Sequence, residues 1–254
     1  MSNALEPAWL LHRRPYGDGS FLADFFALQS GRFSAVVRGA RRKNHGGSLT
    51  GLLQPYTPLL TKKAGRGELK TLHRLEAAGA ALKLRGDAVF MGLYLNELLT
   101  RTIPPFEPLP GLFARYGMTL QQLSTGVDEL TLRAFELTLL EELGFGIRFD
   151  EDASGTRVSE HLWYRYAPGQ GLVSCVFSNA GGQNTALVSG AQLLNIADWN
   201  FTGDGLLAGN RRVLRDLLRT ALGEHLGDKP LQSRLLLRQF RNTTVSTSPS
   251  SSLP

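Results

Sequence analysis

The chain has 254 residues, and its 28 basic and 22 acidic side chains give a formal net charge of +6. A hydrophobic content of 42% and a charged content of 20% are ordinary for a globular protein, and this length allows one large domain or a few small ones. A single cysteine, Cys175, excludes an internal disulfide framework and a thiolate-rich zinc site. The sequence has no apolar run long enough to span a membrane and no signal-peptide pattern at its start, so we expect a cytoplasmic protein.

The first third of the chain has the pattern of a β-barrel. Short apolar segments are separated there by glycine, proline, serine and aspartate, which form turns. We predict five strands, at residues 8–13, 20–28, 32–39, 52–60 and 68–76. Because closing a sheet of short strands removes its exposed edges, we predict a five-stranded OB-type β-barrel over residues 1–80. An SH3-like barrel fits the pattern nearly as well.

The remainder of the chain has a mainly helical pattern. Apolar residues recur at helical spacing from residue 81, and strand-like alternation returns in residues 157–178. Helices are predicted at residues 82–103, 109–123 with a break at Gly117, 128–143, 190–199, 205–226 and 231–240. We therefore predict a helical domain over residues 81–241, with a small strand-containing insertion near residues 155–180, and an α+β fold class overall. Residues 242–254 are rich in serine, threonine and proline and predict a disordered tail.

The charge is distributed unevenly along these regions. Residues 1–80 hold 12 basic and 5 acidic side chains, a net charge of +7. Residues 81–153 hold 6 basic and 11 acidic side chains, whereas residues 154–254 hold 10 and 6. Charge partitioned in this way is common in proteins that bind nucleic acids, because phosphates attract clustered cations.

A basic loop is the strongest functional signal in the residues themselves. Arg38, Arg41, Arg42 and Lys43 follow the third predicted strand, where flexible cations could contact phosphates. The alternative is a loop that is merely solvated. Further cations would extend this DNA-binding surface if they share one rim of the barrel: Arg13, Arg14, Lys62, Lys63, Arg66 and Lys70. Among the aromatic residues nearby, we expect Tyr16, in its glycine-rich turn, to stack on bases.

No catalytic or metal-binding motif emerges from the sequence. The histidines are scattered without metal-ligand spacing, and no nucleophile elbow, phosphate loop or dinucleotide fingerprint is present. We therefore expect neither an enzyme nor a bound metal or cofactor. Cys175 lies in an apolar segment, where we expect it to be buried and inert.

Six stretches, taken in order, resemble the RecO family of bacterial recombination mediators. They are GRFSAVVRGARR (31–42), GLLQPYTPLL (51–60), GRGELKTL (65–72), LYLNELL (93–99), LRAFELTLLEELGFG (132–146) and PLQSRLLLRQF (230–240). The resemblance implies an OB domain followed by a mainly helical remainder. It also implies a nucleoid-associated protein that binds single- and double-stranded DNA, anneals complementary strands and works with single-strand-binding protein, RecR and RecA.

The resemblance further implies a partner site in the helical part. Family members recognise the acidic, phenylalanine-ended tail of single-strand-binding protein there, and the arginine that contacts this tail matches Arg133. We assign Phe113 and Tyr116 to the same partner-binding surface, with plain core packing as the alternative. Arg133 could instead pair with Glu129 or Glu136 on its own helix.

The zinc site of some RecO-like proteins is not carried over to this chain. Those relatives have a CxxC-type motif in the region that matches residues 150–178. This chain has only Cys175 in that region, so the resemblance implies no metal here.

Other classes of function stay open on the residues alone. A basic barrel would equally serve an RNA-binding OB-fold protein, which a competition between DNA and RNA at fixed salt would detect. A protein-protein adaptor without a direct DNA role would use the helical part alone. A nuclease is the weakest class, because no carboxylate cluster suited to divalent metals lies in the basic region.

Overall fold

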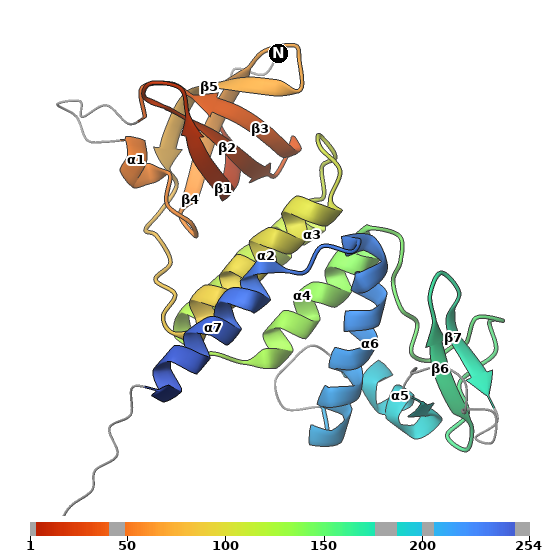
Figure 1. Ribbon diagram of the computed structural model, residues 1–254. Coiled ribbons are helices and arrows are strands. Elements are labelled where there is room, and N and C mark those ends of the chain that lie inside the picture. The colour runs from red at the N-terminus through yellow and green to blue at the C-terminus, as the bar shows by residue number, and fades with distance from the viewer. Residues whose placement is uncertain (1–3, 41–48, 176–186, 200–205, 247–254) are drawn as a thin grey trace, which may run out of the picture. The chain divides into compact units, whose positions relative to one another are not determined.

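The computed structural model describes residues 4–40, 49–175, 187–199 and 206–246 (Figure 1). The chain forms two compact units. The first comprises residues 1–113, 120–127 and 228–254, and the second comprises residues 114–119 and 128–227. The predicted barrel region therefore shares a unit with a segment from the far end of the chain. The domain boundaries predicted at residues 80 and 241 stay predictions.

The first unit begins with a closed five-stranded barrel. Its strands are β1 (Glu6–Tyr16), β2 (Ser20–Ala27), β3 (Gly31–Val37), β4 (Pro58–Ala64) and β5 (Leu69–Ala77). They follow the order β1-β2-β3-β5-β4 around the barrel, with β3 and β5 parallel and the other neighbours antiparallel. A short helix, α1 (Leu49–Leu52), lies between β3 and β4 along the chain. This arrangement confirms the predicted OB-type barrel.

Alternating side chains build the barrel core. In β3 every second residue from Gly31 is buried, as expected for a strand with one face inside and one outside. Phe25 of β2 and Phe33 of β3 are opposite each other in register and stack inside, with ring centroids 5.3 Å apart. Leu10 and Leu59 pack into the same core from β1 and β4. Between these buried residues, Arg32, Ser34 and Val36 of β3 lie on the outer face of the sheet.

The fourth strand begins later than the sequence pattern predicts. The prediction places it at residues 52–60, whereas β4 begins at Pro58 and the preceding Leu49–Leu52 is helical. Leu53 is buried in the barrel core, and Tyr56 is buried with a positive φ of 63°. The prediction is wrong here because an apolar run indicates burial without specifying the path of the backbone.

Two helices follow the barrel along the chain, α2 (Asp87–Thr102) and α3 (Pro110–Thr125), and α7 (Gln232–Ser246), near the end of the chain, packs against α2. The barrel is bound to α2 by hydrogen bonds within the first unit. The Asn96 side chain donates to the carbonyl of Leu11 in β1 (2.9 Å), and the Tyr56 hydroxyl donates to the carbonyl of Val89 (3.1 Å). Burial raises the pKa of Tyr56, so this hydroxyl stays a neutral donor.

The first turn of α7 is held against α2 by the carboxylate of Glu97. Glu97 of α2 accepts hydrogen bonds from the backbone N–H groups of Gln232 (2.8 Å) and Ser233 (2.9 Å), and from the Ser233 hydroxyl (2.7 Å). Burial alone would raise the pKa of Glu97, but these hydrogen bonds and the nearby Arg101 hold it below its ordinary value. Glu97 thus caps the first turn of α7 from another helix.

The linker between α2 and α3 runs beside β3. Pro105 pairs with Arg32 in a parallel bridge, and the N–H of Phe106 donates to the Arg32 carbonyl (2.8 Å). The backbone of Glu107 approaches Gly31 so closely that a Cβ at Gly31 would lie 2.0 Å from the Glu107 carbonyl oxygen. Gly31 also has a φ of 64°. The linker therefore occupies this edge of β3, and only glycine fits at residue 31.

The second unit combines helices with a small sheet. Its helices are α4 (Glu129–Glu142), α5 (Gly190–Ala197) and α6 (Ala208–Leu226), and its strands are β6 (Trp163–Ala167), β7 (Gly171–Cys175) and β8 (Val188–Ser189). Asp128 caps α4 by accepting a hydrogen bond from the Leu130 N–H (3.0 Å). The sheet has the order β7-β6-β8. It confirms the predicted strand-containing insertion and the α+β fold class.

Three helix predictions need correction. α3 runs without a break through Gly117, because one glycine costs a helix only about 1 kcal/mol and the buried Tyr116 and Leu120 hold the turns on either side. α2 begins at Asp87, five residues later than predicted. α7 continues to Ser246, through the first residues of the predicted tail, and residues 247–254 lie outside the described part of the chain.

Candidate nucleic-acid interface

The outer face of four strands forms one continuous surface on the barrel. Arg14 of β1 lies opposite Leu22 of β2, Leu22 lies opposite Val36 of β3, and Val36 lies opposite Thr71 of β5. All four side chains are exposed or half-buried. Because side chains alternate between the two faces of a strand, this row points away from the barrel core. In OB barrels the face of β2 and β3 and the adjoining loops are where oligonucleotides bind.

A hollow of about 540 Å³ lies on this face. It is lined by Tyr16 and the turn at residues 17–20, by Val36 and Arg38 from the end of β3, and by Leu69 and Lys70 from the start of β5. Tyr16 and Leu69 are large apolar side chains that are about half exposed, at 48% and 47%. The hollow therefore combines apolar surface with positive charge. We call it the barrel hollow.

The cations on this face are available to an anionic ligand. Arg14 and Arg38 are exposed on this face, Arg66 is exposed between β4 and β5, and none of the three has an ion pair or hydrogen bond with the described residues. Lys70 donates a hydrogen bond to the Gly65 carbonyl (3.2 Å). Asp18, in the turn that lines the barrel hollow, is the acidic side chain among the lining residues. Arg14, Arg38, Lys70 and Tyr16 therefore lie on a shared surface, and the contact of these residues and of Arg66 with DNA stays a prediction.

Lys63 does not belong to this surface. Its ammonium group pairs with the carboxylate of Glu6 and the hydroxyl of Ser30, and it lies 4.2 Å from the ring centroid of the core residue Phe33. Its side chain is only 15% exposed. Lys63 lies opposite the buried Leu72 of β5 and two residues after the buried Thr61, so the alternation of β4 turns its side chain inward. The expectation that Lys63 shares the basic rim is corrected accordingly.

Arg13 also has a partner inside the chain. Its guanidinium donates to the carbonyl of Thr50 in α1 (3.2 Å) and lies 4.8 Å from the ring centroid of Phe21. Arg13 is opposite Ala23, which is fully buried, so the two residues lie on the core side of their strands. This arginine fastens α1 to the barrel. It does not share the outer face with its neighbour Arg14.

Of the remaining predicted cations, one lies on β4 and three lie outside the described residues. Lys62 is half-buried on β4, opposite Arg74 of β5, and does not line the barrel hollow. Arg41, Arg42 and Lys43 lie outside the described residues. Their contribution to the surface stays a prediction that follows from their place directly after Arg38 and Ala40.

The structure adds two residues to this surface that the sequence reasoning did not select. Leu69 lines the barrel hollow. Phe106, from the α2–α3 linker, contacts Lys70, which also lines the hollow; the Lys70 ammonium is 4.7 Å from the Phe106 ring centroid. A signal for Leu69 existed, since it follows the glycine-rich loop at residues 65–67. Phe106 gave no such signal, because only the pairing of the linker with β3 brings it to the barrel.

The residues predicted to bind a protein partner are largely internal. Arg133 and Glu136 are buried in α4 and form an ion pair of 2.8 Å between Nη1 and Oε2, which is one of the alternatives predicted for Arg133. The geometry of this contact is too poor for a hydrogen bond, and Arg133 Nε has no hydrogen-bond partner among the described residues. A buried guanidinium with unused donors is suited to an additional anion.

The two aromatic residues of the predicted partner surface differ in their surroundings. Tyr116 is fully buried and packs edge-on against Phe135, with ring centroids 6.3 Å apart. Phe113 is half-buried and contacts Phe26 of β2, with ring centroids 5.5 Å apart. Both contacts are those of core packing, the alternative predicted for these residues. Their role in partner binding stays a prediction.

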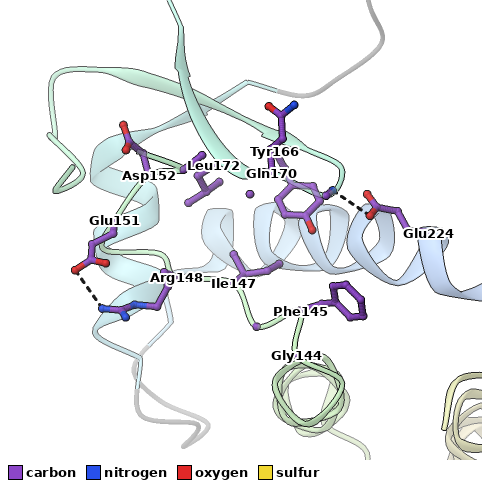
Figure 2. A pocket seen from close by; sticks show the side chains of 14 residues that line it. Gly144, Phe145, Ile147, Arg148, Glu151, Asp152, Tyr166, Gln170, Leu172 and Glu224 are labelled. Carbon is purple, nitrogen blue, oxygen red and sulfur yellow. Dashed lines mark hydrogen bonds and ion pairs between the residues drawn. The ribbon is translucent and has the colours of Figure 1, made fainter. Parts of the chain in front are cut away.

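A second hollow, of about 250 Å³, lies in the second unit and contains none of the predicted site residues (Figure 2). Its charged side chains already interact with one another or with the backbone. Arg148 pairs with Glu151 (3.2 Å), and Glu224 accepts a hydrogen bond from the Gly169 N–H (3.2 Å) on the other side of the hollow. Burial, aided by the charge of Glu224, raises the pKa of Tyr166.

The Cys175 thiol is less buried than the sequence predicts. Cys175, at the end of β7, is half-buried, and its Sγ lies 3.5 Å from the Trp163 carbonyl oxygen, so the prediction of a buried thiol is wrong.

Among the described helices, none has the length and apolar content to cross a membrane. No group of three or more potential metal ligands occurs within the described residues.

Comparison with known proteins gives consistent matches along almost the whole chain. Residues 1–81 match the family described as "Recombination protein O N terminal", and residues 84–235 match "Recombination protein O C terminal". The boundary between the two matches falls between β5 and α2.

Individual relatives are similar to this chain over almost their whole length. The DNA repair protein RecO of Pseudomonas paraeruginosa is 44% identical over 92% of this chain and 94% of its own length. The RecO of Pseudomonas putida (strain W619) is 45% identical over 92% of this chain and 97% of its own length. The RecO of Alkalilimnicola ehrlichii is 41% identical over 97% of this chain and 96% of its own length.

Proposed function

This chain belongs to the RecO family of DNA repair proteins, and we propose that it acts as a recombination mediator. In this role it binds single- and double-stranded DNA, anneals complementary strands and, together with RecR, helps RecA to replace single-strand-binding protein. It works on chromosomal DNA, in the cytoplasm and at the nucleoid. None of these steps makes or breaks a covalent bond, so the protein acts as a binding platform and not as an enzyme.

One observation carries the DNA-binding part of this proposal. Arg14, Arg38 and Arg66 are exposed on the OB barrel without partners among the described residues, and Arg38 lines the barrel hollow. Unpaired arginines of this kind can neutralise phosphates and release the counterions that condense on DNA. Affinity for DNA should therefore fall steeply with salt and depend little on base sequence.

Annealing follows from the same electrostatics. Two complementary strands repel each other through their phosphates, and a cationic surface screens this repulsion when both strands lie close to it. Base pairing then supplies the specificity. The protein needs no contacts that read the sequence.

The test is annealing and binding of labelled strands by a variant with four alanines, at Arg38, Arg41, Arg42 and Lys43. We expect weaker binding, a shallower dependence of affinity on salt and slower annealing. A matched control removes four arginines from α6, namely Arg211, Arg212, Arg215 and Arg219, and we expect it to bind DNA like the unchanged protein. Equal losses in the two variants would contradict binding by the barrel, and a preference for RNA in competition at fixed salt would favour RNA handling instead.

We further propose that Arg133 receives the terminal carboxylate of the single-strand-binding protein tail. The support is its burial in α4 with a guanidinium nitrogen that lacks a hydrogen-bond partner among the described residues. In such a low-dielectric place a carboxylate would gain strong, charge-assisted hydrogen bonds. Tyr116 packs against Phe135, two residues from Arg133 along α4, and we assign the phenylalanine ring that precedes this carboxylate to the same part of the protein.

The test is binding of a fluorescent peptide that carries the acidic, phenylalanine-ended tail. Because replacing Arg133 alone would leave Glu136 buried without its counter-charge, the informative variant is Arg133→Gln combined with Glu136→Gln. We expect this double variant to fold and to lose peptide binding, whereas Arg148→Gln, at an exposed ion pair, should retain it. Wild-type peptide affinity in a folded double variant would contradict the assignment.

A further inference from the structure

Exposed apolar side chains gather at the barrel hollow. Tyr16 (48% exposed) and Leu69 (47%) line the hollow from β1 and β5, and Phe106 (37%) lies beside it. Lys70 lines the hollow, and its ammonium lies over the Phe106 ring at 4.7 Å, so it places Phe106 beside the hollow. These are three of the eleven large apolar side chains that are exposed within the described residues. Their clustering around a hollow lined by cations needs a reason, because scattered exposed apolar residues are normal but clustered ones mark binding sites.

Phe106 has an unusual backbone conformation. Its φ of 62° lies in the left-handed region, which is unfavourable for an aromatic residue. Two contacts with Arg32 fix it there, namely the hydrogen bond from its N–H to the Arg32 carbonyl and the bridge formed by Pro105. β5 begins at Leu69, which pairs with Ser34 of β3. The linker pairs with Arg32, in the part of β3 that precedes its pairing with β5. Strained backbone at an exposed aromatic residue is typical of functional sites.

The chemistry of the surface selects its ligand. Aromatic and apolar faces beside arginine and lysine match a molecule that alternates flat apolar rings with anionic groups. A single nucleic-acid strand has this character, because its bases are free to leave the backbone and stack on a protein. A duplex does not, because its bases are stacked on each other and only its phosphates and groove edges are accessible.

We propose that the barrel hollow, completed by Phe106, binds unpaired bases of single-stranded DNA through Tyr16, Leu69 and Phe106. This inference rests on the proposed DNA-binding function and divides its surface into two parts. The arginines bind phosphates of either single or double strands, whereas the three apolar side chains bind only a single strand. A consequence for annealing is that pairing withdraws the bases from the hollow, so the annealed duplex is held less tightly than the strands that formed it.

The experiment measures binding of three labelled DNA molecules by fluorescence anisotropy. They are an oligothymidine, an abasic oligonucleotide of equal length and a duplex. The variants Tyr16→Ala and Leu69→Ala should each weaken binding of the oligothymidine by about 5- to 10-fold, as expected when one base no longer stacks, with no change of its salt dependence. Binding of the abasic strand and of the duplex should stay as in the unchanged protein.

Phe106 is tested with two substitutions because its ring also contacts Lys70. Phe106→Trp keeps an aromatic face and should retain oligothymidine binding, whereas Phe106→Leu should weaken it. Phe145→Ala is the matched control, since Phe145 is a phenylalanine of similar exposure (49%) in the second unit. Thermal unfolding of every variant shows that it is folded.

The outcomes separate this inference from the proposed function. If Tyr16→Ala and Leu69→Ala leave oligothymidine binding unchanged, or weaken the abasic strand equally, the base-binding inference is overturned while phosphate binding by the barrel can still hold. If the unchanged protein binds none of the three DNA molecules, the proposed function itself fails. Equal weakening by Phe145→Ala would also contradict the inference.

Discussion

Lys63 and Arg38 carry the same charge on the same barrel, but they lie in opposite environments. Lys63 is turned inward onto Glu6, Ser30 and the ring of Phe33, whereas Arg38 is exposed at the barrel hollow and has no partner among the described residues. The difference shows that clustered positive charge in a sequence contains two populations. One population stabilises the fold through partners in the chain, and the other is available to a ligand.

The strand geometry decides to which population a cation belongs. Arg14 and its neighbour Arg13 point to opposite faces of β1, so one is exposed and the other is fastened to α1. Lys62 and Lys63 differ in the same way in β4, because Lys62 lies opposite the exposed Arg74 and Lys63 lies opposite the buried Leu72. Substitutions of inward-facing groups should therefore change stability, and substitutions of outward-facing groups should change DNA binding.

The largest effect is expected for Lys63→Met. It removes the counter-charge of Glu6, whose side chain is only 9% exposed, and leaving a buried charge without its partner costs about 3–5 kcal/mol. Urea denaturation should show this loss, while the folded variant should keep the salt dependence of DNA binding. Lys83→Met is the control, because Lys83 is exposed, and it should stay within about 0.5 kcal/mol of the unchanged protein. A stable Lys63→Met variant with weakened DNA binding would reverse the comparison.

Gly31→Ala should have the next largest effect. A Cβ at residue 31 would meet the Glu107 backbone, and alanine is unfavourable at a φ of 64°. We expect a loss of about 2–4 kcal/mol from the clash and the backbone strain together. Gly17→Ala has a similar φ of 56° but open space around its Cβ, so it isolates the conformational part. Similar stabilities for the two variants in denaturation would show that the linker does not press on β3.

Glu97→Gln should have a smaller, pH-dependent effect. Its carboxylate is another charge with partners inside the chain, and its removal should cost about 1–2 kcal/mol at pH 7. Because the folded-state pKa is lowered, the stabilisation by Glu97 is present above its ordinary pKa of 4.5 and is lost as pH falls through the folded value. Denaturation curves of the variant and the unchanged protein should therefore converge in acid. A difference that grows below pH 4.5 would contradict the role of the carboxylate.

Cys175→Ser should have the smallest effect. The thiol is half-buried, and serine keeps a donor for the Trp163 carbonyl. We expect a stability change within about 0.5 kcal/mol and unaltered DNA binding. A large loss of thermal stability would show that the environment of Cys175 is more demanding than its exposure indicates.

Much of the fold follows from the sequence, because alternation and helical spacing report which side of an element is buried. The barrel, the small sheet and helices such as α4 and α6 are predicted in this way. The fourth strand and the supposed break at Gly117 are not, because burial does not specify the backbone path and packing overrides a weak local preference. For the candidate site, Arg38 and Tyr16 are found from composition and turn chemistry.

Other parts of the site depend on contacts between distant residues. Phe106 reaches the barrel only because its linker pairs with Arg32, and the partners that hold Lys63 inside, Glu6 and Ser30, are distant from it in the sequence. The burial of Arg133 likewise depends on tertiary packing. Charge patterns therefore indicate the candidate region but not which of its cations face outward.

The most direct test of this account compares Arg14→Ala/Arg38→Ala with the unchanged protein in binding labelled single-stranded DNA across a range of salt. The account predicts weaker binding and a log-log salt slope that is shallower by about 0.7 for each phosphate that the variant no longer neutralises, without a decrease in thermal stability. Unchanged affinity and slope in a folded double variant would contradict the claim that the outward-facing cations of the barrel form the DNA-binding surface.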